Sequence, residues 1–394
     1  MPEVWKGPKE FEWQQLRDQF KYLKSLPPEL AAHFPKVFEL VGDGPKSKYS
    51  MEEIPIPPYV TLRDSILKGP LAERITFERA HTILSNVLDF GFEKLYPSRS
   101  YAVSVDGYMR EVYFDRLKKR LNDVKKVCTG RLEGEESSLR ERSYFTCFLR
   151  MLEEEEIVIN EEAFDNPLRI IAEIESNVRD YAPVLCPIRL YHIHGDLHFD
   201  NIYFDRNDAE GRGCFLIDPR GFLNGGDIAY DVGKLLHSCH GYYDFIHEGL
   251  FSLEFLPTRK ILALAFDVLN GSGRVFHIPK EIGEKGGSGA RFQAWHVLSG
   301  AEYQLFKDLG EALPQLVERY EIVRRDQLIM LRSKFLEAMH FCTMAPFHLR
   351  ASGIRTTIAL HAQGIRLLSN AYDALKLEIR RRRPGSKGRR SRKG

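Results

Sequence analysis

Apolar residues recur along most of the chain with the spacing of amphipathic helices. The segment 9–26 places Trp13, Leu16 and Phe20 on one helical face, and two prolines follow it. The same kind of spacing predicts helices over 72–95, 108–127, 137–156, 167–181, 231–240, 259–269, 290–308, 313–341 and 350–380. The pattern therefore predicts a protein that is mainly helical beyond its first 70 or so residues.

Four short apolar runs interrupt this helical pattern and predict strands. The runs 37–41 and 50–54 flank a segment that contains Asp-Gly, a frequent hairpin turn. The runs 202–204 and 214–217 flank a polar, glycine-rich segment, which predicts a second hairpin. Helices combined with antiparallel hairpins indicate an α+β fold.

The second hairpin carries polar residues whose spacing suits phosphoryl transfer. Residues His194 to Asn201 read His-Gly-Asp-Leu-His-Phe-Asp-Asn, and Ile-Asp-Pro ends the return strand. Asn201 opens the first strand and Asp218 closes the second, so antiparallel pairing brings them together, about 5 Å apart at the backbone. Two oxygen ligands then converge where Mg²⁺ could bind with phosphate. Asp196 precedes the hairpin and can face a substrate hydroxyl as its base.

These residues resemble the aminoglycoside phosphotransferase and choline kinase family. The resemblance lies in His-Gly-Asp-x-x-x-x-Asn, in the later Ile-Asp, and in Gly-Asp-x-x-Tyr-Asp-x-x-Lys within 226–235. It implies a protein-kinase-like fold of two lobes, with Asp196 as catalytic base and with Asn201 and Asp218 as Mg²⁺ ligands. The Asp-Pro-Arg-Gly form at 218–221 is most similar to the branch found with bacterial surface-polysaccharide genes.

The resemblance also implies a division of the chain into three regions. Residues 1–56 would form a reduced N-terminal β lobe that ends in a hinge. Residues 57–379 would form a large helical C-terminal lobe that holds the catalytic loop and the metal-binding hairpin. Residues 380–394 contain nine Lys or Arg and no acid, and we expect them to form a disordered basic tail.

The N-terminal lobe departs from the pattern of the family. A glycine- or serine-rich phosphate loop normally precedes the strand lysine, but only five residues precede Lys6. We therefore expect a lobe that is reduced or truncated. Lys6 would be the lysine that contacts phosphate, with an ordinary surface lysine as the alternative. The helix position that normally carries its glutamate partner holds Asp18 or Gln19.

Further nucleotide contacts follow from the resemblance alone. Met51, Glu52 and Ile54 lie in the segment expected to be the hinge, where backbone groups would bind adenine. His198 stands two residues after Asp196, where protein kinases have a lysine, and it would contact the phosphate or the base.

The implied activity is transfer of the γ-phosphate of ATP or GTP to a hydroxyl of a small molecule, with Mg²⁺ as cofactor. The acceptor would be a sugar or polysaccharide precursor, or a choline- or aminoglycoside-like alcohol. One alternative is a non-catalytic module of the same fold that binds a nucleotide or a partner. Another is a metal-dependent hydrolase, because His192, His194, Asp196 and His198 occupy alternate positions that point to one side of a strand.

Composition bears on the expected cellular location of the protein and on its surface charge. No apolar run approaches the roughly 18 residues of a membrane span, and the first residues lack a signal-peptide core. The six cysteines are scattered, which favours reduced thiols in a cytoplasmic protein. Without the basic tail, 48 basic residues face 55 acidic ones, a net charge of −7. We expect the tail to bind anionic surfaces non-specifically.

Overall fold

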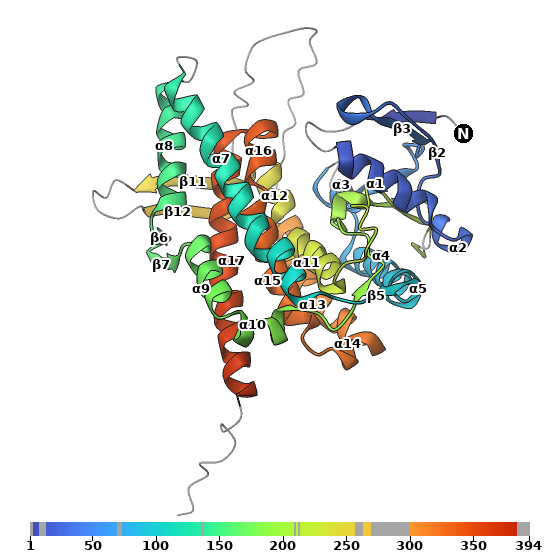
Figure 1. Ribbon diagram of the computed structural model, residues 1–394. Coiled ribbons are helices and arrows are strands. Elements are labelled where there is room, and N and C mark those ends of the chain that lie inside the picture. Colours follow the sequence, from blue (N-terminus) through green and yellow to red (C-terminus); the bar gives the residue numbers. More distant parts are fainter. Residues whose placement is uncertain are drawn as a thin grey trace, which may run out of the picture.

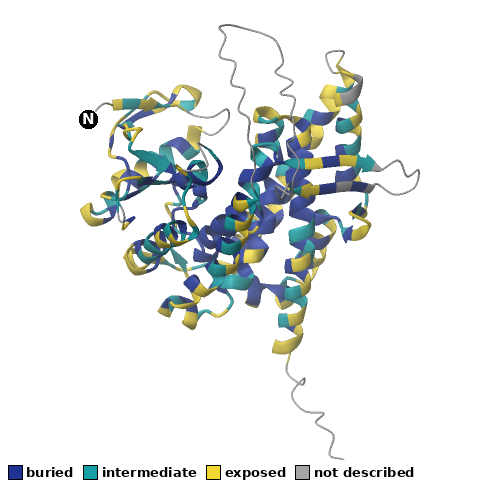
Figure 2. Ribbon diagram, turned by 180° about the vertical axis from the view of Figure 1, so that it is seen from behind, coloured by how far each residue is buried: buried dark blue, intermediate teal, exposed yellow. Residues whose placement is uncertain are grey.

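The computed structural model describes residues 3–7, 13–68, 73–134, 138–208, 210–211, 213–256, 263–268 and 300–383. Within these ranges most residues are helical, and the strands form small sheets. A small N-terminal sheet lies beside a larger body of helices (Figure 1). Buried residues concentrate inside the helical body, whereas the N-terminal part is more exposed (Figure 2). The predicted α+β class is confirmed.

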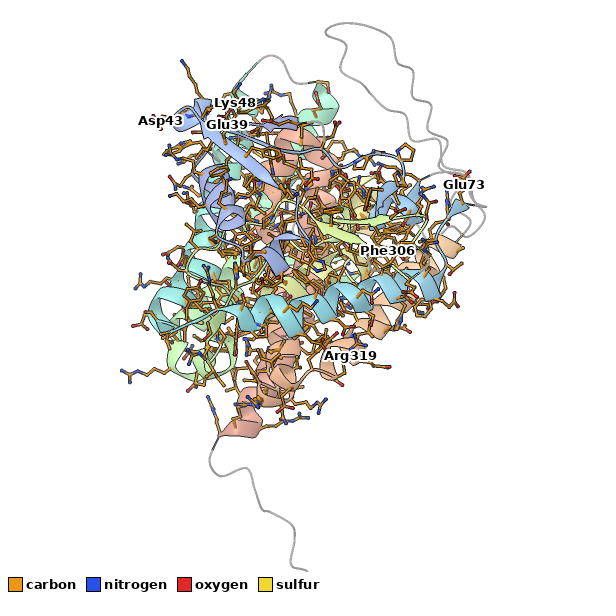
Figure 3. All side chains as sticks on the ribbon, turned by 90° about the vertical axis from the view of Figure 1, so that its right-hand side faces the viewer. Glu39, Asp43, Lys48, Glu73, Phe306 and Arg319 are labelled. Carbon is orange, nitrogen blue, oxygen red and sulfur yellow. The ribbon has the colours of Figure 1, made fainter. Side chains whose placement is uncertain are left out.

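The N-terminal sheet contains β1 (Glu3–Lys6), β2 (Val37–Val41) and β3 (Lys48–Glu52). The strands are antiparallel in the order β1-β3-β2, so β3 occupies the centre. Helix α1 (Trp13–Lys24) forms within the predicted 9–26 segment. It buries Leu16, Gln19, Tyr22 and Leu23, whereas Trp13 of the predicted apolar face is exposed. Lys48 lies near Glu39 and Asp43 at the outer part of this sheet (Figure 3).

The chain enters the helical body through β4 (Tyr59–Thr61). This strand pairs with β9 (Ile202–Asp205), which in turn pairs with β10 (Cys214–Leu216), and both pairings are antiparallel. Helix α3 (Leu62–Leu67) starts at once, because the Thr61 hydroxyl accepts a 3.0 Å hydrogen bond from the Asp64 amide. The hairpin predicted from 202–204 and 214–217 is therefore confirmed.

The helical body is built around α11 (Ile228–Cys239), in which every residue is buried. Helix α15 (Ile329–Thr343) packs against α11 and also against the long helix α17 (Gly353–Arg382). The remaining α-helices in the described ranges are α2 (Pro28–Ala31), α4 (Phe77–Phe90), α5 (Tyr96–Ser98), α6 (Val105–Met109), α7 (Asp115–Glu133), α8 (Leu139–Glu153), α9 (Pro167–Ser176), α10 (Val178–Leu185), α12 (Tyr243–His247), α13 (Ala301–Glu318), α14 (Glu321–Arg325) and α16 (Ala345–Ala351).

Two further sheets join distant parts of the body. A four-stranded sheet has the order β11-β12-β6-β7, in which only β12 and β6 are parallel, and β5 pairs with β8. The strands are β5 (Ser100–Tyr101), β6 (Glu156–Ile159), β7 (Glu162–Asp165), β8 (Leu190–Tyr191), β11 (Phe251–Leu256) and β12 (Ala263–Val268).

Two predicted helices are wrong. Residues 263–268, part of the predicted helix 259–269, form β12, in which Leu264 and Phe266 are buried with the two-residue period of a strand. The predicted helix 313–341 is broken into three, because α13 ends at Glu318 and α15 begins at Ile329.

Some predictions lie partly or wholly beyond the described residues. Residues 290–299 of the predicted helix 290–308 are outside them, and α13 begins at Ala301. Helix α17 continues to Arg382, so the first residues of the predicted basic tail are helical, while 384–394 fall outside the described part. No helix in the described ranges is both long enough and apolar enough to cross a membrane.

Candidate functional site

A cavity of about 1090 Å³ lies between the N-terminal part and the helical body. Lys6 of β1 and Gln19 of α1 line it on one side. Asp196, Asp218 and Lys234 line it from the helical body. The cavity therefore collects polar side chains from five separate segments of the chain.

The loop that carries Asp196 is anchored to the buried start of α11. The amides of His194 and Gly195 both donate to the Asp231 carboxylate, at 2.8 and 2.6 Å. Burial raises the pKa of Asp231 to about 7, although these amide hydrogen bonds lower it. The carboxylate of Asp231 thus fixes the backbone that leads into Asp196.

Asn201 holds the other end of this loop. Its Nδ2 donates to the carbonyl of Asp196 at 2.7 Å, so the side-chain oxygen Oδ1 is left to act as a ligand. The carbonyl of Asn201 accepts a 3.1 Å hydrogen bond from the amide of Ile217, the residue before Asp218. The hairpin therefore brings Asn201 beside the strand end that carries Asp218.

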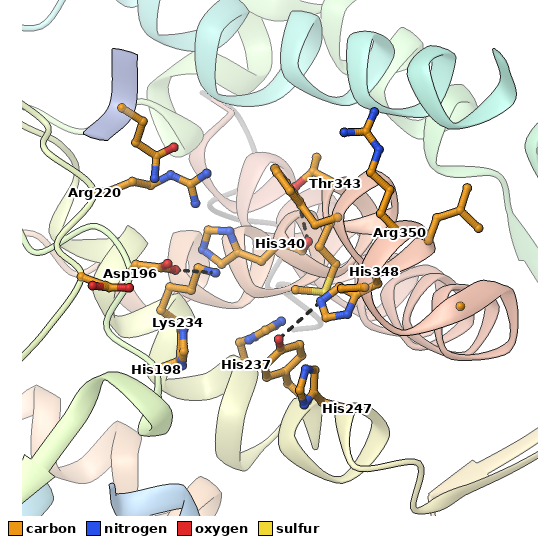
Figure 4. A pocket seen from close by; sticks show the side chains of 18 of the residues that line it. Asp196, His198, Arg220, Lys234, His237, His247, His340, Thr343, His348 and Arg350 are labelled. Atoms are coloured by element: carbon orange, nitrogen blue, oxygen red, sulfur yellow. Dashed lines mark hydrogen bonds and ion pairs between the residues drawn. The ribbon is translucent and has the colours of Figure 1, made fainter. Parts of the chain in front are cut away.

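Asp196 forms an ion pair with Lys234 of α11, whose Nζ is 2.9 Å from Oδ1 (Figure 4). Burial alone would raise the pKa of Asp196, but Lys234, with His198 and Arg220, holds it well below its usual value. The sequence motif contains Lys234 but gave it no role. The sequence feature that could have identified Lys234 is a single lysine in a helix whose other residues are mostly apolar. In the structure every residue of this helix is buried.

Lys6 connects the N-terminal sheet to the hairpin. Its ammonium forms an ion pair with Asp218 and donates to Gln19 Oε1 at 3.0 Å. The same Oε1 accepts from the Tyr49 hydroxyl at 3.0 Å, and Gln19 Nε2 donates to the carbonyl of Pro219 at 2.6 Å. Of the two positions considered as the partner of Lys6, Gln19 is the one in contact.

The segment after Asp218 packs closely against α1. Gly221 has φ +72°, and a Cβ built there would lie 2.6 Å from the Asp18 carbonyl carbon and the Gln19 amide nitrogen. A larger residue at this position would push α1 away from the hairpin. The position of Gln19 in the cavity thus depends on this glycine.

The residues predicted to form the hinge lie elsewhere. Met51 is paired with Val4 on one side and with Val37 on the other, and the Glu52 amide donates to the Lys36 carbonyl at 2.8 Å. Ile54 follows the end of β3. None of Met51, Glu52 and Ile54 is among the described residues that line the cavity, whereas Lys6, Asp196, His198 and Asp218 are.

The four residues of the alternative metal cluster do not converge on one point. His192 Nδ1 is hydrogen-bonded to the Ser98 hydroxyl at 3.0 Å, and His194 Nδ1 accepts from the Asp196 amide at 3.2 Å. Burial lowers the pKa of His192, His194 and His198 to about 4. Among the described residues, no group of three or more His, Cys, Asp or Glu is arranged to hold a metal ion.

A buried ion pair fixes α11 against α15. Arg332 Nε donates to Asp227 at 2.7 Å, and its Nη2 donates to Asp326 at 2.7 Å. Asp227 also caps α11 by accepting from the Ala229 amide at 3.0 Å. This arrangement orients the helix that supplies both Asp231 and Lys234.

No family model matches this sequence, and no curated protein matches it. The resemblance described above therefore rests on the motifs themselves.

Proposed function

We propose that the protein is a small-molecule kinase with a two-lobed, protein-kinase-like fold, which transfers the γ-phosphate of ATP or GTP to a hydroxyl group. The observation that carries this proposal is the convergence of Lys6, Asp196 and Asp218 on one cavity. The side chain of Asn201 donates a hydrogen bond to the carbonyl of Asp196 beside it. In this proposal residues 1–56 and 57–379 are the two lobes. The need for ATP or GTP makes a cytoplasmic location part of the same proposal.

Asp196 would act on the acceptor hydroxyl. Its carboxylate is held ionised by Lys234, so it can accept a hydrogen bond from the hydroxyl and then its proton as the oxygen attacks phosphorus. The bond between the γ-phosphorus and the bridging oxygen breaks, and the nucleoside diphosphate leaves. Lys6 would stabilise the phosphate charge from the opposite wall of the cavity.

The residues present fit a magnesium ion. The Asp218 carboxylate and the Asn201 side-chain oxygen are the hard oxygen donors that Mg²⁺ prefers, and they come from adjacent ends of the hairpin. Bound there, Mg²⁺ would neutralise phosphate charge. Lys6, which is paired with Asp218, would then turn toward the phosphate groups.

A non-catalytic nucleotide-binding module is the second candidate, and Gln19 favours it. The family that the motifs resemble has a glutamate at this helix position, whereas the neutral amide of Gln19 gives Lys6 a hydrogen bond without an ion pair. Such a module would bind nucleotide in the same cavity without turnover.

Calorimetric titration with Mg·ATP and Mg·GTP tests both candidates. We expect one nucleotide to bind, and we expect its hydrolysis to accelerate when acceptors from a panel of sugars, sugar acids and amino alcohols are added. Binding without turnover across the panel would favour the module. If neither nucleotide binds in the presence of Mg²⁺, both candidates are wrong.

A further inference from the structure

The cavity continues past Asp196 into a region that the proposed nucleotide contacts do not occupy. Its walls here are formed by α7, α11, α15 and α16, and His237 and His340 face it beside Lys234 (Figure 4). A pocket for one drug-sized ligand is typically about 300–1,000 Å³, so a cavity of about 1090 Å³ has room for more than the reacting end of a nucleotide.

Two buried histidines in this region have ring nitrogens without hydrogen bonds. His237 is 0% exposed and His340 is 2% exposed. Within the part of the chain that the structure describes, Nδ1 and Nε2 of His237 have no hydrogen-bond partner. The same is true of Nε2 of His340. Leaving buried polar atoms unpaired is costly, which points to a ligand that pairs with them.

The protonation state of these rings defines the groups that they can bind. Burial lowers the pKa of both His237 and His340 well below the usual value, and the charge of Lys234 lowers it further. A neutral imidazole has one donor and one acceptor nitrogen. A hydroxyl group also donates and accepts, so these rings suit the hydroxyls of a sugar or another polyol.

Cationic side chains border the same region. Burial alone would raise the pKa of Tyr230, yet Arg116, Arg220 and Lys234 together lower it below its ordinary value against the opposing charge of Asp196. Tyr230 packs edge-on against His340, with ring centroids 4.4 Å apart. Arg116 lies over the Tyr230 ring, 5.4 Å from its centroid, and Arg220 lines the same cavity. These two guanidinium groups favour an anionic group on the ligand.

We propose that this part of the cavity binds the acceptor as an anionic sugar. Its hydroxyls would pair with His237 and His340, and its carboxylate or phosphate would lie beside Arg116 and Arg220. The proposal rests on the proposed function, because Asp196 would receive the reacting hydroxyl. It selects an acidic sugar over the choline- or aminoglycoside-like alternatives.

Titration of the full chain with four small probes tests this choice without any phosphoryl transfer. The probes are glucuronate, glucose 6-phosphate, glucose and glucosamine. We expect at least one anionic probe to bind about tenfold or more tightly than glucose, and we expect glucosamine to bind most weakly. A difference between glucuronate and glucose 6-phosphate identifies the anionic group. If glucose or glucosamine binds as tightly as both anions, the proposal is wrong.

The role of Arg116 is tested by Arg116→Gln, with Lys119→Gln as the matched control. Both residues are on α7, but Lys119 is exposed and is not among the residues that line the cavity. We expect Arg116→Gln to weaken the preferred anion about tenfold and glucose less than about threefold. If both variants change the affinity for the anion equally, the placement of the anionic group beside Arg116 is wrong.

The role of His237 is tested by His237→Phe, which keeps an aromatic side chain and removes both ring nitrogens. If the nitrogens form hydrogen bonds with a ligand, the melting temperature of the variant should be equal or higher. Its affinity for every sugar that binds should be lower. A lower melting temperature with unchanged sugar binding would show that His237 only supports the fold, and the assignment of the hydroxyl site would be wrong.

The proposed function and this inference fail in different ways. Nucleotide binding and turnover with a neutral or cationic acceptor would leave the kinase proposal intact and overturn the anionic site. Selective binding of an anionic sugar without any nucleotide binding would support the anionic-sugar site and contradict the proposed kinase function.

Discussion

Lys6 and Asp218 form an ion pair on the wall of the cavity although 212 positions separate them in the chain. The contact is half-buried, and it joins the first strand to the end of the hairpin. The proposed site depends on this contact, because it brings the only cationic side chain of β1 to the place where phosphate would bind.

Replacement of Lys6 should weaken nucleotide binding. We expect Lys6→Met to raise the Kd for Mg·ATP or Mg·GTP by about tenfold, because it removes a charge-assisted contact to phosphate. Lys48→Met is the matched control, since Lys48 is an exposed lysine of the same sheet that lies over the Trp5 ring, 4.6 Å from its centroid. Calorimetric titration measures both. Equal affinities in the two variants would contradict a phosphate contact by Lys6.

Removal of the charge of Asp196 should stop turnover without stopping binding. We expect Asp196→Asn to lower the rate of phosphoryl transfer by about 10²-fold or more, because the amide cannot accept the proton of the hydroxyl. Nucleotide affinity should stay within about threefold of the natural protein. A coupled assay for the nucleoside diphosphate gives the rate. An unchanged rate would remove Asp196 from the role of base.

Lys234 should set the pH range of activity. Activity requires ionised Asp196 and is lost as pH falls through its pKa, which Lys234 holds well below its usual value of about 3.9. In the natural protein Asp196 should therefore contribute no acidic limb above about pH 5. In Lys234→Met burial dominates, the pKa of Asp196 rises, and the acidic limb of the pH–rate profile moves to higher pH.

A purely structural role for Lys234 predicts a different result. Loss of folding would lower the rate at every pH by the same factor, with no movement of the acidic limb. The pH–rate profile of Lys234→Met, measured together with its melting temperature, separates the two roles.

Loss of the buried ion pair at the start of α11 should destabilise the fold. Arg332 and Asp227 are 1% and 2% exposed, so Arg332→Met leaves a buried carboxylate without its cation. We expect a loss of about 3–5 kcal/mol in the free energy of unfolding, measured with urea. The double variant with Asp227→Asn should recover part of it.

An exposed pair provides the comparison for Arg332. Arg382 donates to Glu378 at 2.7 Å on the surface of α17, with the arginine 48% exposed. We expect Arg382→Met to change the free energy of unfolding by less than about 1 kcal/mol. Similar losses in the two variants would show that burial does not determine the effect.

Gly221 should be required for the contact between α1 and the hairpin. Gly221→Ala places a methyl group 2.6 Å from the α1 backbone at φ +72°, so α1 and with it Gln19 must shift. We expect a lower melting temperature and weaker nucleotide binding. Gly44→Ala is the control, because Gly44 also has positive φ (+55°) but no atom lies within 4 Å of its Cβ position. A control that loses as much nucleotide affinity would contradict the role of the close contact.

The sequence predicted the hairpin of β9 and β10 well because the information there is local. The apolar run before the glycine-rich turn and the one after it specify the pairing of β9 with β10, and this pairing places Asn201 next to Ile217. The phosphate contact of Lys6 was predicted only from the family resemblance. Its partner on α1 was left open between Asp18 and Gln19, and the structure places Gln19 in contact. Neighbours along the chain were thus easier to predict than contacts between distant segments.

Other features of the fold and of the site could not be read from the sequence. Residues 263–268 have an apolar pattern compatible with helix or strand, and only pairing with β11 and β6 determines the strand. His237 and His340 are about a hundred positions apart, and they approach each other only because α11 packs on α15. Composition gave a net negative body, whereas the interior of this cavity is lined by more Lys and Arg than by acids.

Gln19 has a consequence for the charge that an incoming nucleotide meets. With a carboxylate at this position, the Lys6 ammonium would be neutralised by two acids at once. The amide gives it a hydrogen bond but leaves Asp218 as its single counter-ion among the described contacts. A triphosphate bound as proposed would therefore compete with one carboxylate for Lys6. Because amide hydrogen bonds are neither titrated nor screened by salt, the link from Gln19 to Tyr49 and Pro219 should persist at ionic strengths that weaken the ion pair.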